Sequence, residues 1–154
     1  MPRGSKESGS ESHLVNEGQL TEVISKLDGI SNAAKEKGKV AYIKAGERGH
    51  YDKEVYQPLS DENGNVFSCE KFYDPLSHDY VGFNITCLLK MDLKVGKLIT
   101  IEDVYFMKKG SQTWSVQHNI FFKKKRRVIR DELPQVPVRA KDLLDTYSEL
   151  LEKS

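Results

Sequence analysis

Several aromatic side chains of this sequence stand beside lysines, and this combination suits the binding of single-stranded nucleic acid. Such binding needs flat rings on which bases can stack and cations along the path of the phosphates. The groups that meet this requirement lie at or near the ends of predicted strands: Tyr42 with Lys44, Lys71 with Tyr73, and Tyr105 with Lys108 and Lys109. For each tyrosine, a place in the core or at its rim, with a satisfied hydroxyl, is an equally good interpretation.

A polar stretch between the first two predicted strands holds a second group of candidates, Arg48, His50 and Tyr51. A loop at this position often clamps the ligand in small barrels, although polar composition alone would also produce a solvated loop. Trp114 could stack a base at the start of the last predicted strand. Its alternation with apolar residues favours a place in the core, and His118 on the same strand is interpreted as an ordinary strand residue.

Positive charge is concentrated in the C-terminal half of the chain. Between Val104 and Arg130 there are eight lysines and arginines and no acid, although the whole chain has a net charge of +1. The densest part of this run includes Lys123, Lys124 and Arg126. The run could extend a phosphate path, act as a nuclear localisation signal, or keep the end of a strand solvated.

No catalytic motif is recognisable in the sequence. It lacks GxSxG, GxxxxGK[ST] and HExxH. Asp61 and Glu62 lie in a polar turn, and Glu102 and Asp103, as neighbours in a strand, should point to opposite faces. The sequence therefore predicts a protein that is not an enzyme and that has no cofactor and no metal site.

Length and composition indicate one domain in solution inside the cell. The 154 residues fit a single ordinary domain. No run approaches the roughly 20 apolar residues of a membrane span, and residues 1–12 lack the apolar stretch of a secretory signal. Cys69 and Cys87 occur without a CxxC or a Cys/His cluster, so both are expected to be reduced and buried.

The apolar pattern predicts a flexible tail over residues 1–18, then a helix, a series of short strands and a second helix. The first helix begins near Leu20 and ends at Gly38, a residue suited to a left-handed cap. Apolar residues three and four apart from Ala140 to Leu151 predict the second helix. Residues 46–64 are expected to form a long polar loop. Turn residues delimit five predicted strands, at 39–45, 66–73, 80–89, 98–107 and 113–122.

Alternation along the third strand places Ile85, Cys87 and Leu89 on a buried face. Five strands between two helices are typical of an oligonucleotide-binding (OB) barrel. Residues 19–154 are therefore predicted to form one OB-fold domain, an all-β, five-stranded barrel with one N-terminal and one C-terminal α-helix.

Short motifs within these strands resemble the protection-of-telomeres family. Residues 65–75 (NVFSCEKFYDP) and 84–89 (NITCLL) are similar to the second and third strands of its OB domains, and Val104–Lys109 (VYFMKK) is similar to a later strand. The family usually has an aromatic residue where this chain has Lys90 and Met91, so base stacking is expected to be arranged differently. The resemblance implies a groove that holds extended single-stranded telomeric DNA, at chromosome ends in the nucleus.

Two further functions fit the same sequence. An OB-type adaptor would dock a protein partner of a telomere complex or another nucleic-acid complex. The apolar stripe of the terminal helix would then be either part of the core or a partner surface: Leu143, Leu144, Tyr147, Leu150 and Leu151. Single-stranded RNA is the other alternative, because no pattern in the sequence would read a 2′-hydroxyl.

Overall fold

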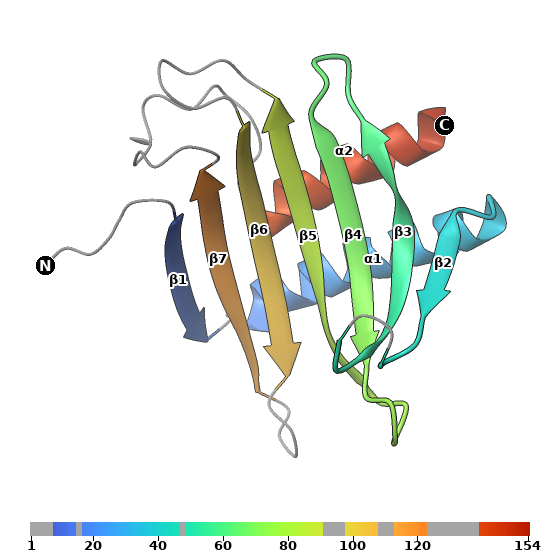
Figure 1. Ribbon diagram of the computed structural model, residues 1–154, viewed down its shortest axis with the longest axis vertical. Coiled ribbons are helices and arrows are strands. Elements are labelled where there is room, and N and C mark those ends of the chain that lie inside the picture. Colours follow the sequence, from blue (N-terminus) through green and yellow to red (C-terminus); the bar gives the residue numbers. More distant parts are fainter. Residues whose placement is uncertain (1–7, 15–16, 47–48, 91–97, 108–112, 123–138) are drawn as a thin grey trace, which may run out of the picture.

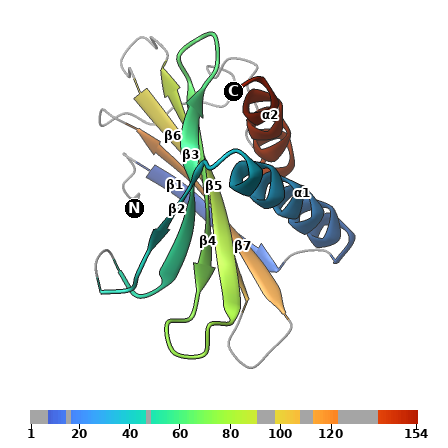
Figure 2. The same cartoon turned by 90° about the vertical axis from the view of Figure 1, so that its right-hand side faces the viewer.

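The computed structural model describes residues 8–14, 17–46, 49–90, 98–107, 113–122 and 139–154. These residues form one antiparallel sheet with two helices packed against one face (Figure 1, Figure 2). We call the face turned away from the helices the open face. The helices are α1 (Glu17–Glu36) and α2 (Ala140–Lys153). The strands are β1 (Ser8–Leu14), β2 (Val40–Ile43), β3 (Asp52–Ser60), β4 (Val66–Tyr73), β5 (Tyr80–Lys90), β6 (Leu98–Met107) and β7 (Trp114–Phe122).

Six consecutive strands, β2 to β7, pair in order as an antiparallel meander, and β1 joins the sheet beside β7. The edge strands β1 and β2 therefore lie at opposite sides of the sheet, which does not close (Figure 1). The prediction of an OB barrel is wrong, whereas the prediction of antiparallel strands flanked by an N-terminal and a C-terminal helix is confirmed. The two helices supply a second layer, so the apolar face of the sheet is covered without closure.

The five predicted strands correspond to β2 and β4 to β7, but the predicted polar loop contains a further strand, β3. This strand turns Glu54, Tyr56 and Leu59 inward, and its register with β4 shifts between Tyr56 and Leu59. The sequence does not show the apolar–polar alternation typical of a strand here, because the inward Glu54 is charged and Pro58 lies at the register shift.

The first strand lies within residues 1–18, which the sequence predicts to be a flexible tail. Residues 8–14 have the sequence SGSESHL, which has no apolar alternation. They pair with β7 over their whole length, from Ser8 opposite Phe121 to Leu14 opposite Ser115. The expectation of a flexible tail is therefore wrong for these seven residues, because backbone pairing needs no apolar side chains.

The core lies between the sheet and the helices. β5 contributes Phe83, Ile85, Cys87 and Leu89, each 0% exposed, so the predicted alternation of this strand is confirmed. Cys69 lies on the neighbouring strand β4. Both cysteines are free and buried, as the sequence predicts.

The first helix ends where the sequence places its end. Gly38 has a φ of 68°, in the left-handed region that glycine adopts without strain. Its N–H donates to the backbone oxygen of Lys35 at 3.1 Å, and the N–H of Lys39 donates to that of Ala34 at 2.8 Å. These bonds close the last turn of α1 and lead the chain directly into β2.

The second helix buries its apolar stripe against the sheet and α1. Leu143, Leu144, Tyr147 and Leu151 are all buried, and the Tyr147 hydroxyl donates to the backbone oxygen of Gln57 at 2.6 Å. Of the two interpretations of this stripe, the structure therefore supports a place in the core. Neither of the described helices has the length and apolar character that crossing a membrane would require.

A buried carboxylate holds the N-terminus of α2. Asp103 on β6 accepts a hydrogen bond from the backbone N–H of Ala140 at 2.8 Å and also contacts Nδ1 of His118 on β7. Its neighbour Glu102 lies on the open face, where it bonds Asn119. The two acids therefore point to opposite faces, as predicted, and His118 is a strand residue with a structural contact.

Candidate functional site

Six strand ends meet at one end of the sheet, which we call the Tyr73 end. Antiparallel pairing brings together the last residues of β2, β4 and β6 and the first residues of β3, β5 and β7. These residues are Ile43, Tyr73, Met107, Asp52, Tyr80 and Trp114. Side chains that are distant in the sequence are therefore neighbours at this end.

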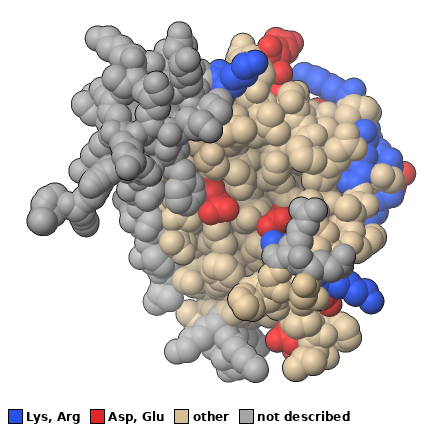
Figure 3. Space-filling view, viewed as in Figure 1, with Lys and Arg blue, Asp and Glu red and all other residues tan. Residues whose placement is uncertain are grey.

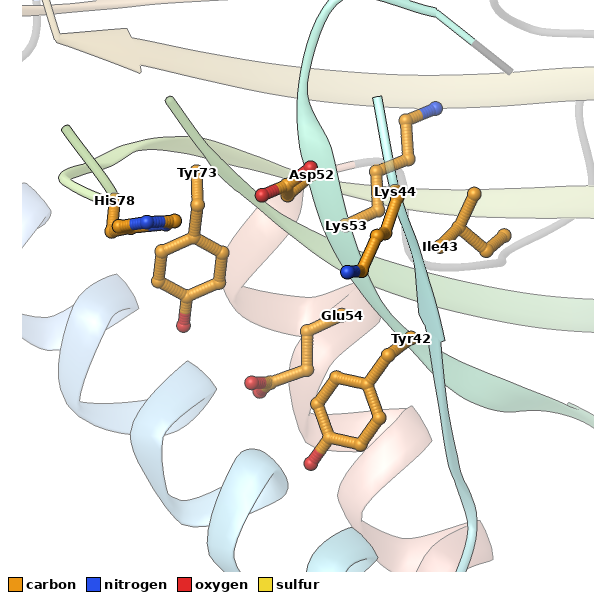
Figure 4. Close-up of a pocket in the computed structure, with 8 residues that line it drawn as sticks. All are labelled: Tyr42, Ile43, Lys44, Asp52, Lys53, Glu54, Tyr73 and His78. Atoms are coloured by element: carbon orange, nitrogen blue, oxygen red, sulfur yellow. The ribbon is translucent and has the colours of Figure 1, made fainter. Parts of the chain in front are cut away.

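A cleft of about 280 Å³ opens at the Tyr73 end, beside the edge strand β2 (Figure 4). Its lining comes from β2, β3, β4 and the segments that follow β2 and β4: Tyr42, Ile43, Lys44, Asp52, Lys53, Glu54, Tyr73 and His78. Tyr42, Lys44 and Tyr73 are among the residues that the sequence predicts for nucleic-acid binding. The fold thus brings together aromatic–lysine groups from two separate strands.

Aromatic rings line this cleft, and a lysine outside the lining lies over one of them. Tyr42 is 69% exposed, and Tyr73 is partly exposed. His78, in the turn after β4, also lines the cleft (Figure 4). Lys71, the predicted partner of Tyr73, places its Nζ 5.8 Å from the centroid of that ring and 4.9 Å from the ring of Tyr80. This arrangement provides flat apolar faces together with a cation that can shift from a ring to an anion.

Glu54 is a buried carboxylate in the wall of the cleft. It is 6% exposed and accepts hydrogen bonds from Ser31 Oγ at 3.0 Å and from the Tyr56 hydroxyl. Burial alone would raise the pKa of Glu54, but these two hydroxyls and the nearby Lys35 outweigh it and lower the pKa below its usual value. Glu54 is therefore ionised at neutral pH, and its charge is offset by groups of the protein itself.

Asp52 is the second carboxylate of the cleft. Its Oδ1 accepts a hydrogen bond from the backbone N–H of Ala45 at 2.8 Å, which ties the chain after β2 to the start of β3. In the register of the sheet, Asp52 lies directly opposite Tyr73. A base stacked on Tyr73 would therefore have a hydrogen-bond acceptor within reach of its edge.

His78 is the one described non-glycine residue whose φ, 65°, lies in the left-handed region. Asp74 builds the turn before it: its carboxylate accepts the N–H groups of Leu76 at 2.8 Å and Ser77 at 3.0 Å, and its backbone oxygen accepts that of His78 at 2.8 Å. A left-handed conformation costs a non-glycine residue about 1–2 kcal/mol. Such conformations cluster at functional sites, so this turn supports the cleft as a site.

Tyr105 lies in the core, and its predicted stacking role is corrected accordingly. The residue is 7% exposed, and its ring stacks on Phe83 with 4.7 Å between centroids and 5° between planes. Its strand position faces the helices, so no face of the ring is open to a base. Trp114 lies at the rim of the same core, partly exposed, with its ring 6.2 Å from Phe83.

His50 and Tyr51, the described members of the predicted loop cluster, are not among the residues that line the cleft. His50 is exposed, and the ring of Tyr51 lies 5.8 Å from Phe72, which stacks on Phe106 across β4 and β6. The remaining predicted cations lie outside the described residues: Arg48, Lys108, Lys109, Lys123, Lys124 and Arg126.

Sequence reasoning missed Asp52, Glu54 and His78 as residues of the cleft. The first two lie on β3, whose polar composition predicts a loop. A signal for His78 does exist in the run Asp-Pro-Leu-Ser-His, because an Asp at the start of such a run commonly accepts the N–H groups that follow it. That pattern predicts the turn, but not that the turn borders Tyr73.

The open face carries a chain of polar side chains across five strands, joined by one ion pair and four hydrogen bonds. Successive N···O distances are 3.2–3.5 Å along the series Lys53, Glu70, Asn84, Glu102, Asn119 and Gln117. Burial raises the pKa of Glu102; the hydrogen bond from Asn119 opposes the rise, and the charges of Glu70 and Asp103 add to it. Figure 3 shows acidic side chains within a mostly uncharged area in the middle of this face.

Within the described part of the chain, no three His, Cys, Asp or Glu side chains are grouped so that they could hold a metal ion. Comparison with known proteins gives no relative, since no family model, curated protein or solved structure matches the chain. The function is therefore inferred from the cleft and its surroundings.

Proposed function

We propose that this protein binds single-stranded nucleic acid and that the strand occupies the cleft at the Tyr73 end. One observation carries the proposal: the cleft joins Tyr42 and Lys44 of one strand region with Tyr73 of another, and Lys71 lies over the Tyr73 ring. These are the ring-and-cation groups that single-strand binding requires.

We assign different tasks to the residues of the cleft and to Lys71 beside Tyr73. Tyr42 and Tyr73 offer faces for bases, each worth about 1–3 kcal/mol of stacking. Lys44 and Lys71 reach the phosphates, which positions the strand without reading its sequence. Asp52 accepts hydrogen bonds from amino groups on base edges. Duplex DNA is a poor ligand for such a site, because its paired bases have no free faces.

The preferred ligand is DNA, and telomeric DNA in particular. This part of the proposal rests on the resemblance of residues 65–75 and 84–89 to strands of the protection-of-telomeres family. The protein then acts by occupancy at chromosome ends in the nucleus, where a bound strand is shielded from other proteins. Single-stranded RNA is the alternative ligand, since ring stacking and phosphate contacts do not distinguish RNA from DNA.

Fluorescence anisotropy of labelled oligonucleotides tests this proposal. The ligands are G-rich telomeric DNA, its complement, RNA of matched sequence, a scrambled oligonucleotide and a duplex. We expect single strands to bind and the duplex to compete poorly. Two phosphate contacts, from Lys44 and Lys71, predict a log–log salt slope of about −1.4. Equal affinity for single strands and duplex would contradict the proposal, and equal affinity for matched RNA and DNA would remove the preference for DNA.

Substitutions locate the site. Tyr73→Ala should weaken binding by about 1–3 kcal/mol. Leu76→Ala is the matched control, because Leu76 is 91% exposed in the loop directly after Tyr73 and has no ring. Lys71→Glu should weaken all sequences by similar factors, whereas Lys141→Glu, an exposed reversal on α2, should change little. Equal binding by Tyr73→Ala and Leu76→Ala, with unchanged circular dichroism, would exclude the cleft as the site.

A further inference from the structure

Partly exposed aromatic rings extend beyond the cleft at the Tyr73 end, along the edge of the core. A row of three partly exposed rings continues from Tyr73 through Tyr80 to Trp114. The ring centroids of Tyr73 and Tyr80 are 5.9 Å apart, and those of Tyr80 and Trp114 are 5.6 Å apart. Tyr73 belongs both to this row and to the cleft, so the two surfaces are continuous.

We propose that this row is the second half of the binding site and that it holds the strand in an extended form, with one base on each ring. The inference rests on the proposed function and adds the path and the conformation of the ligand. Together with Tyr42, the row provides four rings, so the shortest strand that fills the site has about four nucleotides, at the lower end of the range for single-strand binding folds.

The inclination of the rings to one another selects an extended single strand. The planes of Tyr73 and Tyr80 are inclined by 40°, and those of Tyr80 and Trp114 by 63°. Bases stacked on neighbouring rings are therefore not parallel and cannot also stack on each other. A single strand can separate its bases in this way, whereas a duplex would have to give up both stacking and pairing.

Lys71 supplies a cation to the first part of the row. Its Nζ lies near the rings of both Tyr73 and Tyr80. A base that stacks there takes over the ring face, and the displaced ammonium group is then within reach of the phosphate that follows. Lys71 therefore moves from a cation–π contact to a phosphate contact when the strand binds.

The hydroxyl of Tyr80 indicates that stability of the fold is not the sole reason for a tyrosine at this position. In the described part of the chain, its hydroxyl is a buried side-chain oxygen without a hydrogen-bond partner. An unsatisfied buried hydroxyl destabilises a fold, and phenylalanine would fill the same space without that penalty. Tyr80→Phe therefore keeps the ring and should leave the thermal midpoint unchanged or raise it.

Trp114 permits a direct test, because it is the single tryptophan of the chain. Its fluorescence is followed in a titration with telomeric oligonucleotides of two, four and eight nucleotides, while anisotropy of labelled strands reports binding separately. We expect the four- and eight-nucleotide strands to quench Trp114 and the dinucleotide, held in the cleft, to leave it unchanged. Strands that bind by anisotropy without altering Trp114 fluorescence would overturn this inference and leave the proposed function intact. Absence of binding by anisotropy would instead overturn the proposed function.

Substitution of Tyr80 separates the ring from the hydroxyl. Tyr80→Ala should lower affinity about 5- to 150-fold, whereas Tyr80→Phe should bind as the unchanged protein does. If both substitutions weaken binding equally, the hydroxyl makes the contact and the stacking row is wrong. Trp114→Phe serves as the variant that keeps a ring at the end of the row, and unchanged circular dichroism shows that each variant is folded.

Discussion

On the helix-covered face of the sheet, Glu54 accepts hydrogen bonds from the hydroxyls of Tyr56 and Ser31, whereas on the open face Glu102 accepts them from the amides of Asn119 and Asn84. Burial acts on both carboxyls in the same direction. The pKa of Glu54 is nevertheless lowered, because two hydroxyls and a lysine stabilise its charge, while that of Glu102 is raised. The partners of a buried carboxylate thus decide the sign of its shift.

This difference extends to the two faces as a whole. The helix-covered face is an apolar core into which single polar groups are fitted with dedicated partners, such as Glu54. The open face instead shares its partners along a chain, in which Asn84 bonds both Glu70 and Glu102. We therefore expect stability to depend mainly on the first face, and the second to tolerate change.

Core packing should give the largest contrast. Phe83→Ala removes a fully buried ring from the helix-covered face of β5 and should cost about 3–5 kcal/mol of unfolding free energy. Thr86→Ala, on the open face of the same strand, should cost at most about 0.5 kcal/mol. Urea unfolding at neutral pH measures both. Comparable losses would show that the open face also carries a packed layer.

Substitution of the two glutamates should give smaller changes in unfolding free energy, a loss at Glu54 and no loss or a gain at Glu102. Glu54→Gln keeps the size of the side chain but removes the charge that Ser31 and Tyr56 stabilise, so it should cost about 1–3 kcal/mol at pH 7. Glu102→Gln removes a charge that burial disfavours and should leave stability equal or higher. The same urea titrations decide the matter, and a loss at Glu102 as large as that at Glu54 would contradict the comparison.

The pH dependence of these two variants should be the finest test. The folded-state pKa of Glu54 is lowered, so its stabilising contribution is present above the ordinary Glu pKa of about 4.3 and is lost as pH falls through the folded value. Glu102 has a raised folded-state pKa, so its unfavourable contribution grows as pH rises through the window above about 4.3. The advantage of Glu102→Gln should therefore shrink as pH falls from 7 to about 4.3, whereas the deficit of Glu54→Gln should persist over this range and shrink only below about 4.3.

The unfolding free energies of both variants and of the unchanged protein, measured in parallel from pH 7 to well below about 4.3, check the prediction. Parallel curves for all three proteins would mean that neither carboxyl has a shifted pKa. If the stability advantage of Glu102→Gln grows as pH falls, the pKa of Glu102 is lowered and not raised.

Side-chain periodicity predicted much of the fold but little of the cleft. Alternation along β5 identifies Ile85, Cys87 and Leu89 as core residues, because that strand has a regular apolar face. β6 has the consecutive apolar residues Val104, Tyr105 and Phe106, so alternation cannot tell which ring faces the helices. The position of Tyr105 depends on its partner across the sheet, which the sequence of one strand does not contain.

The sequence-based prediction was wrong about the barrel and missed strand β3 with Glu54, and the two errors have related reasons. An open sheet and a barrel have the same strand periodicity, and they differ in whether the edge strands pair, which is a long-range property. The two amphipathic helices were the relevant sign, since they are sufficient to cover one face of a sheet. β3 was not recognised as a strand because the sequence does not distinguish a buried glutamate that has hydrogen-bond partners, such as Glu54, from a solvated one.

The order of the strands has a consequence for how the chain folds. From β2 to β7 each strand pairs with the next along the chain, so the meander can grow hairpin by hairpin with short loop closures. The helix layer is different, because Lys26 of α1 and Asp145 of α2 form an ion pair across 119 residues of sequence. Contacts of such separation form late and slow folding. We therefore expect a folding pathway in which the sheet forms early with its apolar face exposed, until α2 closes over it.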